Sequence, residues 1–429
     1  MPALFFCPHA GGALTGRSLI LSSMWRNAGF LKLWGGQTIS EIGSRITREG
    51  LPLTAVLVLG ATPAQMGVLS ATGSLSVLLF SLFAGVVVDR VRRRPVMIAA
   101  DVGRALLLTA VPVLFFLHRL SIANLVVVAA SAGVLTVLFE VAYQSYLPSL
   151  VSPGELLEGN RLLSISGATA EILGPSITGI LVQLITAPIA VLLDALSFLI
   201  SALSIWSIRS SERAPQPAPR VPFRTEMLEG TRVIFAHGVL RALLFRSVTA
   251  FLFAGAIFSF YVLYAIRVLQ FSPAALGLVI ALGGAGSLAG GLLSTRIVRR
   301  LGVNRTFFPS ALVIGLTQFL LPLASLSKRF GFACLCLQQF VGDCAWTVYF
   351  VNETTLRQTA TPAHLLGRVN AAMQFASRGM LPVGALAAGF LGQSIGLTNT
   401  LWIGAAGVLL SALWLTPLLS STTIERNCE

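Results

Sequence analysis

The chain has 429 residues, of which 55% are hydrophobic and only 11% are charged, and its mean hydropathy is +0.83. A soluble domain has about 25% charged residues, so this chain has too little charge to cover a water-facing surface. The formal net charge of +14 comes from arginines in short clusters between apolar runs. This is the positive-inside pattern of a membrane protein, and it argues against a nucleic-acid partner.

The apolar runs predict an all-α polytopic membrane protein with twelve transmembrane helices in two six-helix pseudo-repeats. A helix needs about 20 apolar residues to cross a bilayer, whereas outer-membrane barrels alternate apolar and polar residues. We expect the spans at 30–58, 64–88, 95–117, 121–145, 160–184, 187–208, 241–266, 273–296, 305–326, 330–352, 369–392 and 397–419.

These spans divide the chain into five segments. We expect a disordered N-terminal extension (1–23), an N-terminal half (24–208), a linker with an amphipathic helix (209–238), a C-terminal half (239–420) and a tail (421–429). Met24 begins a more typical membrane-protein start, so the sequence leaves open whether residues 1–23 belong to the native protein. Most loop arginines follow spans two, six, eight and ten, which places both termini, the linker and the tail in the cytoplasm.

Two patterns recur between the halves. The motif Gly85-Val-Val-Val-Asp-Arg-Val-Arg-Arg-Arg94 after span two is echoed by Gly291-Leu-Leu-Ser-Thr-Arg-Ile-Val-Arg-Arg300 after span eight, and only the acid is lost. A second echo has one constant offset: Asn160, Gly174, Gly179 and Gln183 match Asn370, Gly384, Gly389 and Gln393. Because glycine lets helix backbones approach closely, the paired glycines predict matching helix crossings in the two halves.

The two halves and the basic motif resemble the major facilitator superfamily. Its signature, G-x-L-A-D-R-x-G-R-R/K, is matched by Gly85, Asp89, Arg90, Arg93 and Arg94, while Arg92 replaces the second glycine. Further stretches resemble the macrolide-efflux and enterobactin-exporter branch of drug:proton antiporters: Gln37-Thr-Ile-Ser, Leu51-Pro-Leu, Ala100-Asp-Val-Gly-Arg104, Leu192-Leu-Asp-Ala-Leu-Ser-Phe198 and Leu366-Gly-Arg-Val369.

The resemblance implies a conformational latch. In the superfamily this motif binds the start of helix eleven and stabilises the outward-facing state, a role that here falls to Gly85, Asp89, Arg90 and Arg93. A carboxylate gains from the dipole of a helix N-terminus, and Leu366-Gly-Arg-Val-Asn370 would supply that helix start. The alternative is that the arginines only anchor the topology.

A glycine–proline pattern in span five resembles the antiporter motif of helix five in exporters of the superfamily. It comprises Gly167, Gly174, Pro175 and Gly179, although Thr178 stands where a further glycine is expected. Proline removes a backbone hydrogen bond and bends the helix, and the glycines admit a neighbour into the bend. A purely structural kink is the alternative.

Ionisable residues within spans usually face a cavity or each other. Glu41, Arg45 and Arg48 share one face of span one with Gln37, and Glu41 can pair with Arg45 one turn away. Together with Glu171 and Asp343 they are our candidates for proton or substrate handling; the alternative is an ion pair that joins helices. Trp346 and Tyr349, which follow Asp343, are candidate contacts for a large, partly apolar substrate. Asp101, Arg104 and Asp194 are predicted to be structural.

The sequence contains no catalytic set, no metal-ligand spacing and no phosphate-binding loop, so it predicts neither an enzyme nor a cofactor or metal site. We predict a monomeric secondary active exporter in a bacterial cytoplasmic membrane. It would move a drug-like or secondary-metabolite molecule outward in exchange for protons, with the lipid bilayer as its surroundings. The alternatives are a siderophore exporter and a non-transporting membrane sensor or scaffold on the same fold.

Overall fold

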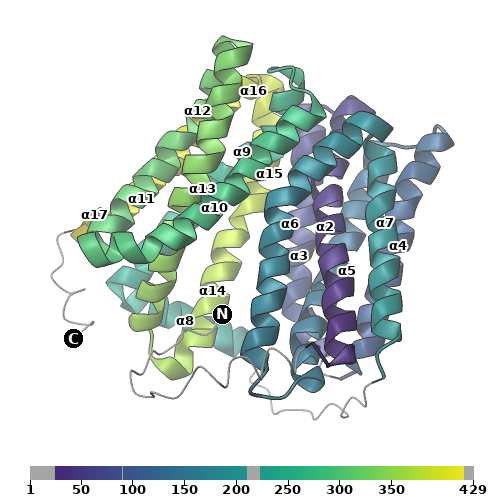
Figure 1. Ribbon diagram of the computed structural model, residues 1–429. Coiled ribbons are helices and arrows are strands. Elements are labelled where there is room, and N and C mark those ends of the chain that lie inside the picture. Colours follow the sequence, from purple (N-terminus) through teal and green to yellow (C-terminus); the bar gives the residue numbers. More distant parts are fainter. Residues whose placement is uncertain (1–24, 89, 210–222, 420–429) are drawn as a thin grey trace.

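The computed structural model describes residues 25–88, 90–209 and 223–419, which form long helices and no strand (Figure 1). Asp89, the predicted extension at 1–23, most of the linker and the tail at 421–429 lie outside the described residues. The helices form two groups, one before and one after the short helix α8 (Phe223–Ala236).

The first group contains six helices, each within a few residues of a predicted span. They are α2 (Ala28–Leu57), α3 (Pro63–Val88), α4 (Arg93–Phe116), α5 (Ile122–Leu150), α6 (Leu156–Ile185) and α7 (Ala187–Trp206). Polar caps set several of their starts. The Asn27 side chain accepts the Phe30 amide, and Ser121 and Asn124 form a reciprocal capping box at the start of α5.

The second group also follows the predicted spans, but three of its spans are built from shorter pieces. The continuous helices are α9 (Gly238–Arg267), α10 (Pro273–Leu301) and α13 (Lys328–Thr359). The pieces are α11 (Val303–Gln318), α12 (Leu320–Leu323) and η1 (Ala324–Leu326); η2 (Ala363–Leu365), α14 (Leu366–Arg378) and α15 (Met380–Ser394); and α16 (Leu397–Leu410), η3 (Ser411–Leu415) and α17 (Thr416–Leu419).

Ten segments of the described chain are long and apolar enough to cross a membrane. The two predicted spans that do not qualify are α2 and α13, although they have 30 and 32 residues. These helices carry Glu41, Arg45, Arg48 and Glu49 in α2 and Asp343 and Glu353 in α13. The predicted count of twelve spans therefore includes α2 and α13 because of their length and their position among the other spans.

The glycine pairs do mark matching helix crossings, as the sequence predicted. Gly174 lies against α2 and Gly384 against α9, which are the first helices of the two groups. Gly179 lies against α10 and Gly389 against α3, which are the second helices. The turns that follow also match: Thr186 and Gly396 both have positive φ, 78° and 87°, at the same offset in the chain.

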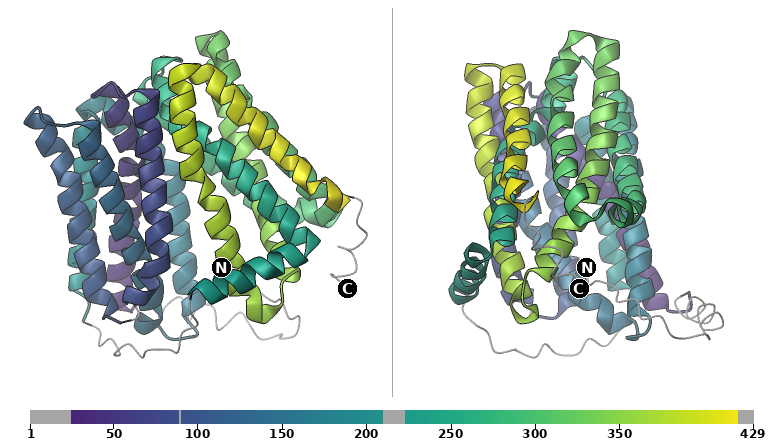
Figure 2. Two further views of the ribbon diagram at one scale, coloured as in Figure 1. Left: turned by 180° about the vertical axis from the view of Figure 1, so that it is seen from behind. Right: turned by 90° about the vertical axis from the view of Figure 1, so that its left-hand side faces the viewer.

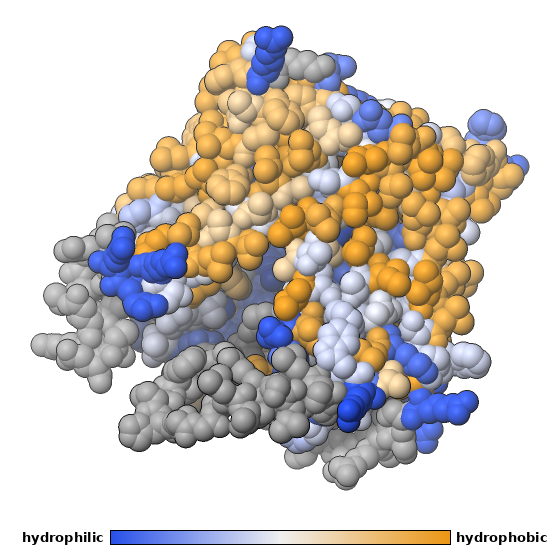
Figure 3. All heavy atoms as spheres, in the orientation of Figure 1, coloured by the Kyte–Doolittle hydropathy of each residue, from blue (hydrophilic) through white to orange (hydrophobic). Residues whose placement is uncertain are grey.

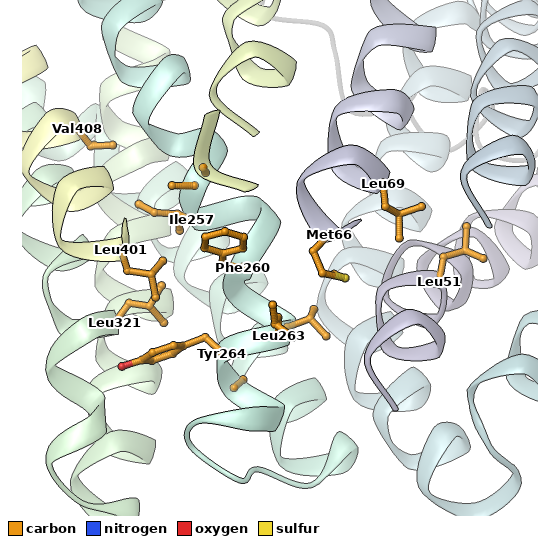
Figure 4. Packing of buried hydrophobic residues seen from close by; sticks show 14 of the residues in the cluster. Leu51, Met66, Leu69, Ile257, Phe260, Leu263, Tyr264, Leu321, Leu401 and Val408 are labelled. Atoms are coloured by element: carbon orange, nitrogen blue, oxygen red, sulfur yellow. The ribbon is translucent and has the colours of Figure 1, made fainter. Parts of the chain in front are cut away.

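The two groups touch at the end of the molecule opposite α8, which lies across the other end of the spans (Figure 2). The main contacts between the groups join α3 to α15 and α6 to α10. They involve the start of α3 and the end of α15, where Gly67 lies against the backbone of Ala385 and Gly389. Phe260 and Met66 lie in the hydrophobic core near this crossing (Figure 4). We call the two ends the α8 end and the joined end.

Toward the α8 end the groups separate. Here α14 makes its main contacts with α8 and with α9 of its own group, and not with α3. The outer surface is largely apolar, as a lipid-facing surface requires, and a hollow between the groups contains hydrophilic residues (Figure 3). The arrangement leaves a polar space between the groups that opens toward the α8 end.

Candidate functional site

Two adjacent glycines in α10 bring together acids from both groups. A side chain at Gly283 would overlap the carboxylate of Asp343 from α13, and Gly284 packs against Ile172 and the carbonyl oxygen of Glu171 from α6. Glu171 and Asp343 therefore lie near opposite sides of the same turn of α10, and their charges interact. The structure thus brings together two of the predicted proton-handling residues, one from each half.

Glu171 is the centre of a small charge cluster. Its Oε2 lies 2.8 Å from Nη2 of Arg45, and its Oε1 lies 3.9 Å from Nη1 of Arg48. Glu49, which the sequence analysis left out of the site, interacts electrostatically with all three. The predicted pairing of Arg45 with Glu41 is wrong, because the Arg45 side chain reaches across to α6 instead of along its own helix.

Part of the predicted antiporter-like motif holds this cluster in place. A Cβ at Gly174 would lie 2.5 Å from Cβ of Arg45, so only glycine admits the arginine stem at that point. Pro175 and Gly179 pack against Gly277 and Pro273 of α10, across the contact between the groups. A Cβ at Gly167 would meet nothing within 4 Å, so this glycine does not belong to the contact.

Asp343 has polar neighbours but no ion-pair partner in the described part of the chain. Tyr261 of α9 lies near it and donates a hydrogen bond to a side-chain amide of α13, with 3.4 Å between Oη of Tyr261 and Oε1 of Gln338. Gln338 in turn donates to Gln318 of α11 at 3.3 Å. These amides were missed by the sequence analysis, although the Gln338-Gln339 pair within an apolar run was a usable signal.

Glu41 lies on a different side of the hollow. It interacts electrostatically with Glu140 of α5, and Glu140 also interacts with the exposed Arg378 at the end of α14. The face of span one therefore divides, with Glu41 directed toward α5 and Arg45 and Arg48 toward α6. Glu140 and Arg378 are additions to the predicted site, from opposite groups.

Tyr349 is fully buried and does not face the hollow. Its ring stacks on Phe307 at 4.7 Å between centroids and lies 3.8 Å from the guanidinium carbon of Arg246. Trp346 is partly buried, with Phe251 at 6.2 Å and Arg246 at 5.9 Å. Arg246, only 1% exposed, was missed by the sequence analysis, although an arginine inside an apolar span is itself a signal.

A second buried cluster occupies the N-terminal group. Asp101 and Arg104 form an ion pair, and the Arg104 guanidinium lies between the rings of Phe139 and Phe198, at 4.6 and 3.9 Å. Asp194 accepts a hydrogen bond of 2.9 Å from the Ser197 hydroxyl. All three ionisable residues are buried, in line with the structural role that we expected for them.

The predicted latch stays a prediction, because Asp89 lies outside the described residues. Gly85 lies in the last turns of α3, Arg90 is exposed, and Arg93 begins α4. Arg94 donates to the carbonyl oxygens of Ile205 and Trp206 at the end of α7, as an arginine near a helix C-terminus can. The start of predicted span eleven, which is α14, contacts α8 through an ion pair between Arg368 and Glu229.

These features define a class of protein: a polytopic helical membrane transporter, with two helix groups around a central polar site. Solved structures share this fold. The nucleoside transporter NupG superposes with a TM-score of 0.75 over 92% of this chain and 100% of that one, at 12% identity. A bacterial homologue of the iron transporter ferroportin gives 0.71 in its inward-facing state and 0.57 in its outward-facing state, at 17% and 16% identity.

The sequence comparisons define the family. Residues 22–424 match the transmembrane secretion effector family, so the chain belongs to this family of the major facilitator superfamily. Its fold and family are those of transporters and not of enzymes.

Relatives include efflux pumps. The multidrug efflux pump Tap of Mycolicibacterium fortuitum is 25% identical over 83% of this chain and 88% of its own length. Macrolide efflux protein A of Streptococcus pyogenes is 22% identical over 89% and 93%. The major-facilitator-type transporter YfiS of Bacillus subtilis is 24% identical over 94% and 95%. The resemblance inferred from the motifs is confirmed.

Proposed function

We propose that this transporter exports a small molecule in exchange for protons, by alternating access at the site around Gly283 and Gly284. The observation that carries the proposal is the position of Glu171 and Asp343, one from each group, on either side of that turn of α10. Relative motion of the groups changes the surroundings of both acids at once. The efflux-pump relatives support the outward direction.

The two acids have different roles in this proposal. Glu171 forms an ion pair with Arg45 and positions the arginine. Asp343 has no cationic partner among the described residues, and an isolated carboxyl group at membrane depth is better suited to bind and release a proton. Asp343 is therefore the proposed proton carrier, and Arg48, with a 63% exposed side chain, is a proposed substrate contact.

We further propose that the α8 end is cytoplasmic and that the structure represents the inward-facing state. Exposed arginines gather at this end, including Arg90, Arg209, Arg232 and Arg300, as the positive-inside rule requires of a cytoplasmic face. The hollow opens toward the same end. The better superposition on the inward-facing ferroportin homologue agrees with this orientation.

The test uses purified protein in liposomes and two assays on a panel of macrolides, dyes and catecholate siderophores. One assay measures uptake driven by a pH gradient; the other measures exchange of labelled for unlabelled substrate without a gradient. We expect Asp343→Asn to abolish gradient-driven transport and to retain exchange, because the substrate site survives without its proton carrier. Glu171→Gln should impair both.

Glu158→Gln is the matched control, since Glu158 is on α6 as well but pairs with Arg161 outside this site. It should leave both assays unchanged. If Asp343→Asn keeps gradient-driven transport, the assignment of Asp343 is wrong. If no compound is exported by the wild type in cells that lack their own exporters, the sensor or scaffold alternative gains support.

A further inference from the structure

Helix α8 has two faces with different surroundings. One face packs inside the protein: Ile234 is buried, and Gly230 lies so close to the carbonyl of Arg368 that a side chain there would overlap it. On the other face, Leu228 and Phe235 are 60% and 47% exposed, and Arg232 between them is exposed without an ion-pair partner in the described chain. Residues 228, 232 and 235 fall on one side of a helix.

The exposed face continues the lipid-facing surface of the spans. Phe235 contacts Phe245 near the start of α9 at 6.1 Å, and Phe245 stacks on Trp414 at 4.9 Å. Trp414 is itself exposed, and its indole N–H donates to Thr249. Aromatic rings beside arginine, on a helix that crosses the ends of the spans, suit the headgroup region of a bilayer (Figure 2).

We propose that Leu228, Arg232 and Phe235 bind the bilayer surface through anionic lipid headgroups, and that α8 transmits this binding to α14. The apolar side chains insert between the lipids, and Arg232 pairs with a phosphate. The inner face holds α14 through the Glu229–Arg368 ion pair and through the close packing at Gly230. Anionic lipid thereby stabilises the arrangement in which α14 lies on α8 and away from α3.

Lipid binding is tested without any transport substrate, so its outcome does not depend on the proposed export function. The melting temperature of the detergent-solubilised full chain is measured against added phosphatidylglycerol, with phosphatidylcholine of the same acyl chains for comparison. We expect a rise with phosphatidylglycerol that needs about fivefold more lipid in Arg232→Gln, the effect of one basic residue near an anionic surface. Leu228→Ser should weaken it as well.

Arg119→Gln is the control, because Arg119 is exposed in the loop between α4 and α5, remote from α8, and loses the same charge. It should retain the wild-type lipid response. Equal responses of the Arg232 and Arg119 variants, or equal effects of the two lipids on the wild type, would overturn the proposal.

The link to α14 needs a separate measurement. In a background with the five cysteines replaced, spin labels at Val87→Cys in α3 and Gln374→Cys in α14 report the distance across the hollow. We expect phosphatidylglycerol nanodiscs to favour the longer distance relative to phosphatidylcholine nanodiscs. Glu229→Gln should remove this lipid effect and leave the lipid response of the melting temperature intact. If phosphatidylglycerol still favours the longer distance in Glu229→Gln, this ion pair does not transmit lipid binding from α8 to α14.

Discussion

Two arginine–carboxylate pairs of the N-terminal group share their chemistry but not their surroundings. The side chains of Arg104 and Asp101 are 5% and 0% exposed, and aromatic rings cover the guanidinium. Those of Arg45 and Glu171 are 16% and 51% exposed, and their pair joins α2 to α6 beside the contact with α10. The first pair belongs to the packing of one group, whereas the second lies where the two groups meet.

The C-terminal group repeats the buried type of cluster. Arg246 lies over the ring of Tyr349 and interacts with Glu353, which pairs with Arg357 at 3.0 Å. Each group thus has an arginine enclosed by aromatic rings, while the acids that interact across the two groups are more exposed. Ionisable residues within the spans are therefore of two kinds. Some stabilise the packing of one helix group, and the surroundings of the others change when the two helix groups move.

The largest expected effect separates the two N-terminal pairs. Arg104→Met leaves Asp101 buried without a cation, which should destabilise the protein by about 3–5 kcal/mol. Arg45→Met leaves Glu171 half-exposed to water, so the cost should be about 0–1 kcal/mol, although transport should be lost. Thermal unfolding and size-exclusion profiles in detergent measure the first effect, and the liposome assays measure the second.

A double variant provides the control. Arg104→Met with Asp101→Leu replaces both charges by apolar side chains, which often restores the stability lost by breaking a buried pair. A protein that remains unstable in the double variant would show that packing around Arg104, and not the unpaired charge, causes the loss. Equal destabilisation by Arg45→Met and Arg104→Met would contradict the distinction between a buried pair that stabilises one helix group and an exposed pair at the contact between the groups.

An intermediate effect is expected at the glycines of the antiporter-like motif. In Gly174→Ala, the new methyl group would overlap Arg45 and displace it from Glu171, with a strain of about 1–3 kcal/mol and a reduced rate of substrate exchange. Gly167→Ala meets nothing within 4 Å and should leave the exchange rate unchanged. If the two variants behave alike, the motif acts by bending α6 and not by admitting Arg45.

Much of the fold was predictable, because apolar runs and arginine-rich loops are direct consequences of crossing a bilayer. The glycine echo also located real helix crossings, because close backbone approach leaves few alternatives to glycine at those positions. The site was less predictable. Spacing along span one placed Glu41, Arg45 and Arg48 on one face, but it could not show that α6 would offer Arg45 a partner.

Residues that depend on tertiary contacts escaped the sequence analysis for the same reason. Nothing near Arg246 in the sequence shows that Tyr349, about one hundred positions later, covers its guanidinium. The glycine pair at 283 and 284 gave no sign that it would face Asp343 on one side and Glu171 on the other. The latch at Asp89 stays a prediction, because that residue lies outside the described chain.

The smallest expected effect concerns Tyr349, which the sequence analysis assigned to the substrate site. Tyr349→Phe keeps the stacking with Phe307 and the ring beneath Arg246 and removes one buried hydroxyl, so we expect the stability to change by less than about 1.5 kcal/mol. The range of transported compounds should be unchanged, because the side chain is buried within its own group. Melting temperature and the substrate panel are the measurements. A changed substrate range with unchanged stability would mean that Tyr349 reaches the substrate in another conformation. The buried cluster of Arg246 and Tyr349 would then resemble Arg45 and Glu171, whose surroundings change during transport.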